Sequence, residues 1–373
     1  MTAFPPYAKN VLVCGGAGYI GSHVVQALLD AGHVPLVIDD LSTGDIRSVP
    51  GSVEVVIGSI GDHRAVEDLF GTHDVVGVVH LCAAGRPGES VDNPGKYYAN
   101  NIANGLVLLG AMLKHGVRDL VFSSSGAVYG RPRRVPISES SDIKPTSPYG
   151  RSYAMFEQIL SDLGEAHDLR CVVLRYFIAA GAREGACLGE GGQAPMGLIP
   201  LILKLALAGQ EEKPAAGGPA TLRVYGTDHP TRDGTCVRDY LHVADVASAH
   251  VLALEHLWRG GDSLVANLAN DRGHSVLEVL DTCERVTGVR IPYKRAPRRP
   301  SDPPELTAQA PTARRVLRWR PQHSDLENIV RTAWEWHRKH LDGYGKPTGA
   351  TPAAPPPSLR PSRPPPEPPS PSP

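Results

Sequence analysis

The first half of the chain alternates short β-branched runs with amphipathic helical stretches, and this alternation restricts the fold more than any other feature. The predicted strands cover residues 10–14, 34–38, 53–57, 75–80, 119–123 and 171–176, and the predicted helices between them cover 21–31, 62–70, 100–115 and 149–167. Continuous Val/Ile/Leu runs separated by helices are typical of a parallel sheet covered on both faces. The sequence therefore predicts an α/β fold with a doubly wound parallel sheet of the Rossmann type.

The alternation ends near Gly181, which suggests a second, smaller domain. Residues 181–239 are rich in Gly and Pro, with one apolar helix predicted at 198–208. Two later helices are predicted to start with capping boxes, in which Ser275 or Ser324 is followed three residues on by Glu. In the second of these helices the spacing of the apolar residues predicts core packing, and they are Leu326, Ile329, Val330, Ala333 and Trp334.

These patterns predict three parts of the chain. The first is a Rossmann domain at 8–180, to which 240–268 returns, and the second is a C-terminal substrate-binding domain made of 181–239 and 269–344. Residues 345–373 are rich in proline and cannot bury apolar surface, so they are predicted to form a disordered tail with polyproline II character.

Composition excludes several classes of function. The 373 residues carry a formal net charge of −1, which gives no electrostatic reason to expect binding to nucleic acid or to an anionic membrane. No apolar stretch is long enough to span a membrane, and the N-terminus lacks the basic and apolar regions of a signal peptide. The six cysteines include no CxxC pair, so neither disulfides nor a metal site is expected. The sequence predicts a reduced, cytoplasmic protein.

A glycine-rich turn joins the first strand to the first helix. Gly15, Gly18 and Gly21 follow the strand directly, and Gly16 also fits the pattern of a dinucleotide-binding turn. Such a turn presents free backbone N–H groups to a pyrophosphate. Asp39 follows the next strand, where its carboxylate can accept the ribose hydroxyls of adenosine and would repel a 2′-phosphate. We therefore expect NAD as cofactor, in preference to NADP. Asp40 is explained equally well as a surface acid.

From the glycine turn to about Gly345 the sequence resembles the UDP-glucose 4-epimerase family of the extended short-chain dehydrogenase/reductase superfamily. The matching motifs, in order along the chain, are Gly15-Gly-Ala-Gly-Tyr-Ile-Gly-Ser-His23, Gly88-Glu-Ser90, Tyr97-Tyr98, Asn100-Asn101, Phe122-Ser-Ser-Ser-Gly-Ala-Val-Tyr-Gly130, Ser147-Pro-Tyr-Gly150, Leu174-Arg-Tyr-Phe177, Asp233-Gly-Thr-Cys-Val-Arg-Asp-Tyr-Leu-His-Val243, Ala296-Pro-Arg-Arg299, Asp302 and Thr332-Ala-Trp-Glu-Trp-His337. The resemblance implies interconversion of UDP-glucose and UDP-galactose through a 4-keto intermediate, with tightly bound NAD.

The resemblance also implies roles for single residues. Tyr149 is the expected base at the sugar 4-hydroxyl, and Ser125 is expected to relay the proton or hold the 4-oxygen. The expected cofactor-binding residues are Gly15, Gly18, Tyr19, Ile20, Gly21, Asp39, Ser59, Ile60, Asn100, Tyr153 and Phe177. The expected substrate-binding residues are Arg238, Arg299 and Asp302, with the two arginines on the diphosphate.

Two of these assignments compete with simpler readings, and the family adds an expectation about assembly. Arg298 and Arg299 also fit a solvated basic face, and one residue of the pair Asn100 and Asn101 fits a helix cap as well as a cofactor pocket. The family implies a homodimer through the predicted helices at 100–115 and 149–167.

Four positions depart from the family pattern. Tyr153 replaces a lysine one helical turn after Tyr149, and Ser59, Gly85 and Ile178 replace an Asp, a Lys and an Asn. A lysine at that spacing shares a face with the tyrosine and lowers its pKa, which is about 10 when unperturbed. A poorly ionised base costs on the order of 10²–10⁴ in rate. A slow epimerase and a non-catalytic NAD- or nucleotide-sugar-binding relative both remain open. A related dehydratase or decarboxylase is disfavoured, because such relatives typically carry an acidic residue two or three places beyond the catalytic-loop Ser/Thr, and Ser125-Gly-Ala-Val has none.

Overall fold

The computed structural model describes residues 8–191, 197–209, 221–299 and 303–345. Seven parallel strands form the central sheet, in the order β10-β6-β5-β4-β1-β2-β3. Their bounds are β1 Asn10–Cys14, β2 Val34–Asp39, β3 Glu54–Ile57, β4 Val75–His80, β5 Asp119–Ser125, β6 Arg170–Tyr176 and β10 Leu264–Asn267. The doubly wound α/β fold and the six predicted strands are confirmed. β10 was not predicted as a strand. It pairs with β6 at the edge of the sheet, although about 90 residues of chain separate the two strands.

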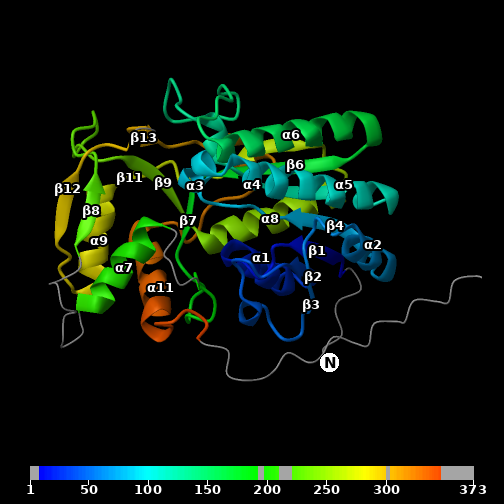
Figure 1. Ribbon diagram of the computed structural model, residues 1–373, viewed down its shortest axis with the longest axis horizontal. Helices are drawn as coiled ribbons and strands as arrows, with labels where there is room; N and C mark the ends of the chain where they lie inside the picture. Colours follow the sequence, from blue (N-terminus) through cyan, green and yellow to red (C-terminus); the bar gives the residue numbers. More distant parts are fainter. Residues whose placement is uncertain (1–7, 192–196, 210–220, 300–302, 346–373) are drawn as a thin grey trace, which may run out of the picture.

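Helices cover both faces of this sheet (Figure 1). On one face lie α1 (Tyr19–Asp30) and α8 (Val243–Trp258), which pack against each other. On the other face lie α2 (His63–Thr72), α5 (Asn104–Lys114) and α6 (Pro148–His167). Most residues of the inner strands β1, β4 and β5 are buried, as the continuous apolar runs require of strands covered on both sides.

The helix predicted at 100–115 belongs to a longer helical run with a π turn in it. The run consists of α4 (Pro94–Tyr98), a π turn at Ala99–Ala103 and α5, and the short helix α3 (Pro87–Asp92) precedes it. Asn100 and Asn101 therefore lie within the run, and neither caps a helix, so the capping alternative is wrong. Wide turns of this kind occur often at functional sites.

A second region lies beside the carboxyl ends of the sheet (Figure 1). Its sheets contain β7 (Ile178–Ala180), β9 (Val237–His242), β11 (Gly273–Ser275) and β13 (Glu305–Leu306), with a separate pair formed by β8 (Leu222–Tyr225) and β12 (Tyr293–Ala296). Its helices are α7 (Leu198–Gly209), α9 (Val276–Thr287) and α11 (Leu326–Lys339), and α10 (Pro311–Arg315) contacts β10. The apolar stripe of α11, including Trp334, is buried in a core of this region, as predicted.

One of the two predicted capping boxes is present. The Ser275 hydroxyl accepts the Glu278 amide at 3.1 Å, and the Glu278 carboxylate accepts the Ser275 amide at 2.9 Å. The box at Ser324 is wrong, because the N-cap of α11 is Asp325. The Ser324 hydroxyl is occupied elsewhere: it donates to the buried Asp245 carboxylate at 2.6 Å and accepts the His242 amide at 2.8 Å.

Among the described helices, none is both long and apolar enough to cross a membrane. All six cysteines lie in described parts of the chain, and each is a free thiol.

Candidate active site

The glycine turn is built so that only glycine fits at two of its positions. Gly15 has a φ of +83°, in the left-handed region that favours glycine. A Cβ on Gly21 would lie 2.0 Å from the Gly15 carbonyl oxygen, so α1 can approach the turn only without a side chain there. Gly18 is the N-cap of α1 and provides no side-chain cap. The first backbone N–H groups of α1 therefore remain available for an anion.

Asp39 is held beside this turn. It is the last residue of β2 rather than the first after it, and only 6% of its surface is exposed. One carboxylate oxygen accepts the Ala17 amide at 2.9 Å and the other accepts the Leu41 amide at 2.9 Å. Burial raises the pKa of the Asp39 carboxyl, and the backbone hydrogen bonds oppose that rise. Asp40 is exposed and accepts the Ser42 amide, in keeping with a surface acid.

These features fit a dinucleotide. A Cβ on Gly18 would have only the Gly15 carbonyl oxygen within 4 Å, at 3.3 Å, so the start of α1 is open on its outer side. Ser59 and Ile60 follow β3, the neighbour of β2 in the sheet. Ser59 accepts the Gly61 amide at 3.1 Å, and Ile60 is buried. The side chain of Tyr19 points away from the turn, since its hydroxyl donates to the Gly181 carbonyl at 2.6 Å.

Tyr149 and Ser125 lie together at the end of the central strand β5. Ser147 caps α6 by accepting the Gly150 amide, and Pro148 occupies the first turn, which places Tyr149 at the start of the helix. The Tyr149 hydroxyl donates to Ser125 Oγ at 3.3 Å. Ser125 Oγ also accepts the Ala127 amide at 3.2 Å, which fixes the short turn after the strand. The two expected catalytic residues are thus in contact.

The surroundings of Tyr149 disfavour its ionised form. Burial raises the pKa of the Tyr149 hydroxyl, and hydrogen bonds with Ser125 and Tyr153 lower it. No positively charged group in the described part of the chain contributes to that shift. Tyr153 is 7% exposed, and its ring meets the Tyr149 ring edge-on at 5.0 Å between centroids. Arg151, between them in sequence, is exposed.

A buried polar network lies beneath this pair, and the sequence reasoning missed it. Ser124 Oγ donates to Glu157 Oε1 at 2.5 Å, and Arg175 Nε donates to the same oxygen at 3.0 Å. Arg175 Nη1 also donates to the Tyr129 hydroxyl at 2.9 Å, which in turn donates to Asn267 Oδ1 at 2.7 Å. The available signal was Arg175, a charged residue directly after the buried apolar run of β6.

Asn100, Asn101 and Phe177 lie near α6 and near the turn that follows Ser125. The Asn101 side chain accepts the Ala84 amide at 2.8 Å and donates to Ser152 of α6 at 3.0 Å, while Asn100 donates to Asn101 at 3.0 Å. Phe177 packs against the turn after Ser125, because a Cβ on Gly126 would lie 2.5 Å from its ring.

The cavity that Arg299 lines does not include Arg238. Arg238 lies on β9 and donates to the Val237 carbonyl at 2.8 Å. The Arg299 guanidinium stacks on Tyr225 at 4.2 Å from the ring centroid, and Arg299 lines a cavity of about 440 Å³. The other residues of this cavity include Arg131, Arg298 and His229, and Arg238 is not among them. Asp302 lies outside the described residues.

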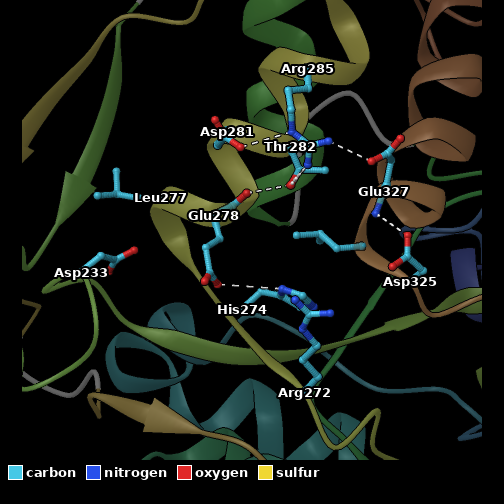
Figure 2. Close-up of a pocket in the computed structure, with 11 residues that line it drawn as sticks. Asp233, Arg272, His274, Leu277, Glu278, Asp281, Thr282, Arg285, Asp325 and Glu327 are labelled. Atoms are coloured by element: carbon cyan, nitrogen blue, oxygen red, sulfur yellow. Dashed lines mark hydrogen bonds and ion pairs between the residues drawn. The ribbon is translucent and has the colours of Figure 1, made fainter.

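A cavity of about 470 Å³ lies elsewhere, between α9 and α11 (Figure 2). None of the expected site residues lines it. Some of its charged side chains contact each other, since Arg285 contacts Glu327 at 2.9 Å and Asp281 at 3.3 Å. Asp325 instead caps α11. Tyr149 and Ser125, the expected catalytic residues, lie at the end of β5 and do not line this cavity.

Comparisons with known proteins show which family the chain belongs to. Residues 11–269 match the NAD dependent epimerase/dehydratase family. The UDP-glucose 4-epimerase of Azospirillum brasilense is 46% identical over 93% of this chain and 97% of its own, and that of Halalkalibacterium halodurans is 43% identical over 90% and 97%.

Solved structures give the same relationship. UDP-glucose 4-epimerase from Brucella ovis in complex with NAD has a TM-score of 0.83 and 41% identity, covering 90% of this chain and 99% of that one. The enzyme from Bifidobacterium longum in complex with NAD⁺ and UDP has a TM-score of 0.82 and 36% identity, covering 90% and 100%. The chain therefore belongs to the UDP-glucose 4-epimerase family, within the NAD dependent epimerases and dehydratases.

Proposed function

We propose that this protein is an NAD-dependent UDP-glucose 4-epimerase, which interconverts UDP-glucose and UDP-galactose. The observation that carries the proposal is the contact between Tyr149 and Ser125 at the end of β5, in the same parallel sheet whose first strand ends in the dinucleotide turn. In open α/β sheets, ligands bind outside the carboxyl ends of the strands. A tyrosine base and a dinucleotide turn at that edge suit oxidation and reduction at one carbon of a bound sugar.

In this mechanism the residues of the chain handle one proton. Tyr149, once ionised, accepts the proton of the sugar 4-hydroxyl, and Ser125 holds the same oxygen by a hydrogen bond. When bound, NAD supplies the hydride acceptor and donor for C4. After the flat 4-keto sugar has turned over, Tyr149 returns the proton, and the site ends in the state in which it began.

The turn and Asp39 are proposed to hold the cofactor. The N–H groups at the start of α1 would bind the pyrophosphate, and Asp39 would accept the adenosine ribose hydroxyls. Arg238 and Arg299 are proposed diphosphate ligands, with the Arg299 cavity receiving the anionic part of the substrate. Residues 8–180 with 240–268 would form the NAD-binding domain, and 181–239 with 269–344 the substrate-binding domain.

A second candidate function is binding of NAD and a nucleotide sugar without turnover. The observation that favours it is the environment of Tyr149. Only the neutral hydroxyls of Ser125 and Tyr153 favour the ionised form of Tyr149, and no cation in the described part of the chain does so. Both functions share the fold and the ligands. They differ only in whether Tyr149 ionises often enough to act.

The deciding experiment is an assay of UDP-galactose conversion by the purified, NAD-loaded protein. We expect slow conversion by wild type and none by Tyr149→Phe, which should still bind NAD and UDP because only a hydroxyl is removed. If neither wild type nor Tyr153→Lys converts the substrate although both ligands bind, the non-catalytic function is the correct one.

We further propose a cytoplasmic homodimer. The outward faces of α5 and α6 carry large apolar side chains that a second copy would cover, since Leu106 and Met155 are each 47% exposed. Six free thiols suit a reducing compartment. Sedimentation of wild type beside Met155→Lys tests the assembly, and a wild-type monomer would contradict it.

A further inference from the structure

Tyr19 joins two parts of the molecule that are far apart in sequence. It is the first residue of α1, within the dinucleotide turn, and its hydroxyl donates to the Gly181 carbonyl at 2.6 Å across a separation of 162 residues. Burial raises the pKa of the Tyr19 hydroxyl well above its ordinary value, so the group stays a hydrogen-bond donor at any physiological pH. The contact therefore persists without titrating.

The carbonyl that Tyr19 binds is fixed from the other side. Gly181 has a φ of +94°, and a Cβ on it would lie 2.7 Å from the His242 ring and 3.1 Å from Thr332 Oγ1. Thr332 Oγ1 accepts the Ala182 amide at 3.2 Å and contacts His242 Nε2 at 3.0 Å. Gly181 is thus clamped between the hydroxyl of Tyr19 and the residues His242 and Thr332.

From Gly181 the connection continues into the strand that carries Arg238. Gly181 directly follows β7, and β7 pairs with β9 along its whole length, from Ile178 opposite Tyr240 to Ala180 opposite His242. Arg238 is the second residue of β9. A short path therefore runs from the dinucleotide turn through the Tyr19 hydroxyl, Gly181 and the pairing of β7 with β9 to the strand that carries Arg238, a proposed diphosphate ligand.

We propose that Tyr19 is a positioning residue that couples the dinucleotide turn to the substrate strand. Occupancy of the strand by the UDP part of the substrate steadies Gly181, and Gly181 steadies the turn through Tyr19. Linkage requires the reverse effect as well, so a filled turn holds Arg238 in place for the diphosphate. The inference rests on the proposed function, because it takes UDP as the ligand on the β9 side.

The test is amide hydrogen exchange of the NAD-loaded protein with and without saturating UDP, followed in peptides that cover the turn. In wild type, we expect UDP to slow exchange in the turn by at least about fivefold, the lower end of typical coupling between sites. In Tyr19→Phe, UDP should still slow exchange in β9, but the effect on the turn should disappear. NAD should stay bound, because the proposed phosphate contacts are backbone N–H groups.

The matched control is Thr332→Val, which removes hydrogen bonds from the opposite side of the same glycine and leaves the Tyr19 contact intact. Its turn should still respond to UDP. Persistence of the response in Tyr19→Phe, or its equal loss in both variants, would overturn the coupling role while the proposed function stands. Failure of UDP to bind wild type would overturn the proposed function and the inference together.

Discussion

At the scale of single residues, Tyr149 must lose its own proton before it can accept one from a sugar. Its surroundings oppose that loss, because burial raises the pKa of the hydroxyl and only Ser125 and Tyr153 counter it. We expect the kcat/KM of wild type to rise with pH well above neutrality, since the phenolate accumulates on the alkaline side. Tyr153→Lys should place an ammonium on the same helical face, raise the rate at pH 7 by roughly 10²-fold, and move the profile to lower pH.

Tyr153→Met is the matched control for that experiment, because it fills much of the same space without a charge. It should leave the alkaline profile in place. A wild-type enzyme that is already fast and insensitive to pH near 7 would mean that another cation serves Tyr149.

Asp39 sets the expected choice of cofactor. Its carboxylate is buried beside the turn and would face the 2′-position of the adenosine ribose, where a phosphate would be repelled. Calorimetry should show tighter binding of NAD(H) than of NADP(H), and Asp39→Asn should narrow that preference. Equal or tighter NADP binding by wild type would mean that the Asp39 carboxylate does not contact the adenosine ribose.

Arg299 and its neighbour Arg298 allow a matched pair of substitutions. Arg298 contacts the Asp228 carboxylate at 2.8 Å, whereas Arg299 stacks on Tyr225. Arg299→Ala should weaken UDP binding by about 1.5–3 kcal/mol, the range for hydrogen bonds to charged groups. Arg298→Ala should change it far less. An unchanged UDP affinity in Arg299→Ala would mean that Arg299 belongs to a solvated basic face and does not bind the diphosphate.

At the scale of elements, the pair Glu157 and Arg175 joins α6, β5 and β6 beneath the proposed catalytic residues. Both side chains are more than nine-tenths buried. Removing one partner leaves the other charge buried alone, so Glu157→Ala should lower the free energy of unfolding by about 3–5 kcal/mol. The double variant Glu157→Leu with Arg175→Leu should lose less, because no unpaired charge remains. Denaturant unfolding measures both, and an equal loss would show that the network stabilises by packing rather than by pairing.

Local patterns predicted the elements whose causes are local. The strands of the central sheet follow from their apolar runs, and the Ser275 box follows from a hydroxyl and a carboxylate three residues apart. The Ser324 box failed because Asp245, far away in sequence, binds the serine hydroxyl. The π turn within the run 94–114 also has no local signal, since Asn101 is held by Ala84 and Ser152.

At the scale of the whole molecule, the contacts between distant segments were the part that the sequence could not supply. The glycine turn and the Ser-Pro-Tyr motif carry their own signatures, so the central residues of the candidate site were predictable. The return of residues 240–268 to the first domain was predicted, but its register was not. The pairings of β10 with β6 and of β7 with β9, and the bond from Tyr19 to Gly181, join residues about 60–160 positions apart, and no periodicity encodes such pairs.

The junction between α1 and β9, around the bond from Tyr19 to Gly181, predicts how the stability of the whole protein responds to acid. His23 of α1 and His242 of β9 are both buried, at 4% and 3% exposure. Burial, with the nearby His242 and Arg183 charges, lowers the pKa of His23 to about 4. Burial, with His323 and Arg331, lowers the pKa of His242 to about 4. Both imidazoles are therefore neutral in the folded protein down to a pH at which an unfolded chain already binds a proton.

Because these folded pKa values lie below the ordinary value of about 6.5, each histidine favours folding above that pH and opposes it as the pH falls toward 4. Each group accounts for about 3 kcal/mol of lost stability by pH 4. Asp239, whose pKa burial raises to about 7, changes the stability in the opposite direction over the same pH range, so a comparison of variants is the sharper test.

His23→Asn keeps a donor for the Tyr19 carbonyl, which accepts from His23 Nδ1 at 2.8 Å, and removes the histidine titration. Denaturant unfolding between pH 7 and 4 should show a smaller loss of stability in His23→Asn than in wild type, and an unaltered loss in His63→Asn, a change at an exposed histidine. Identical pH dependence in wild type and His23→Asn would mean that water reaches His23 and the junction does not resist its protonation.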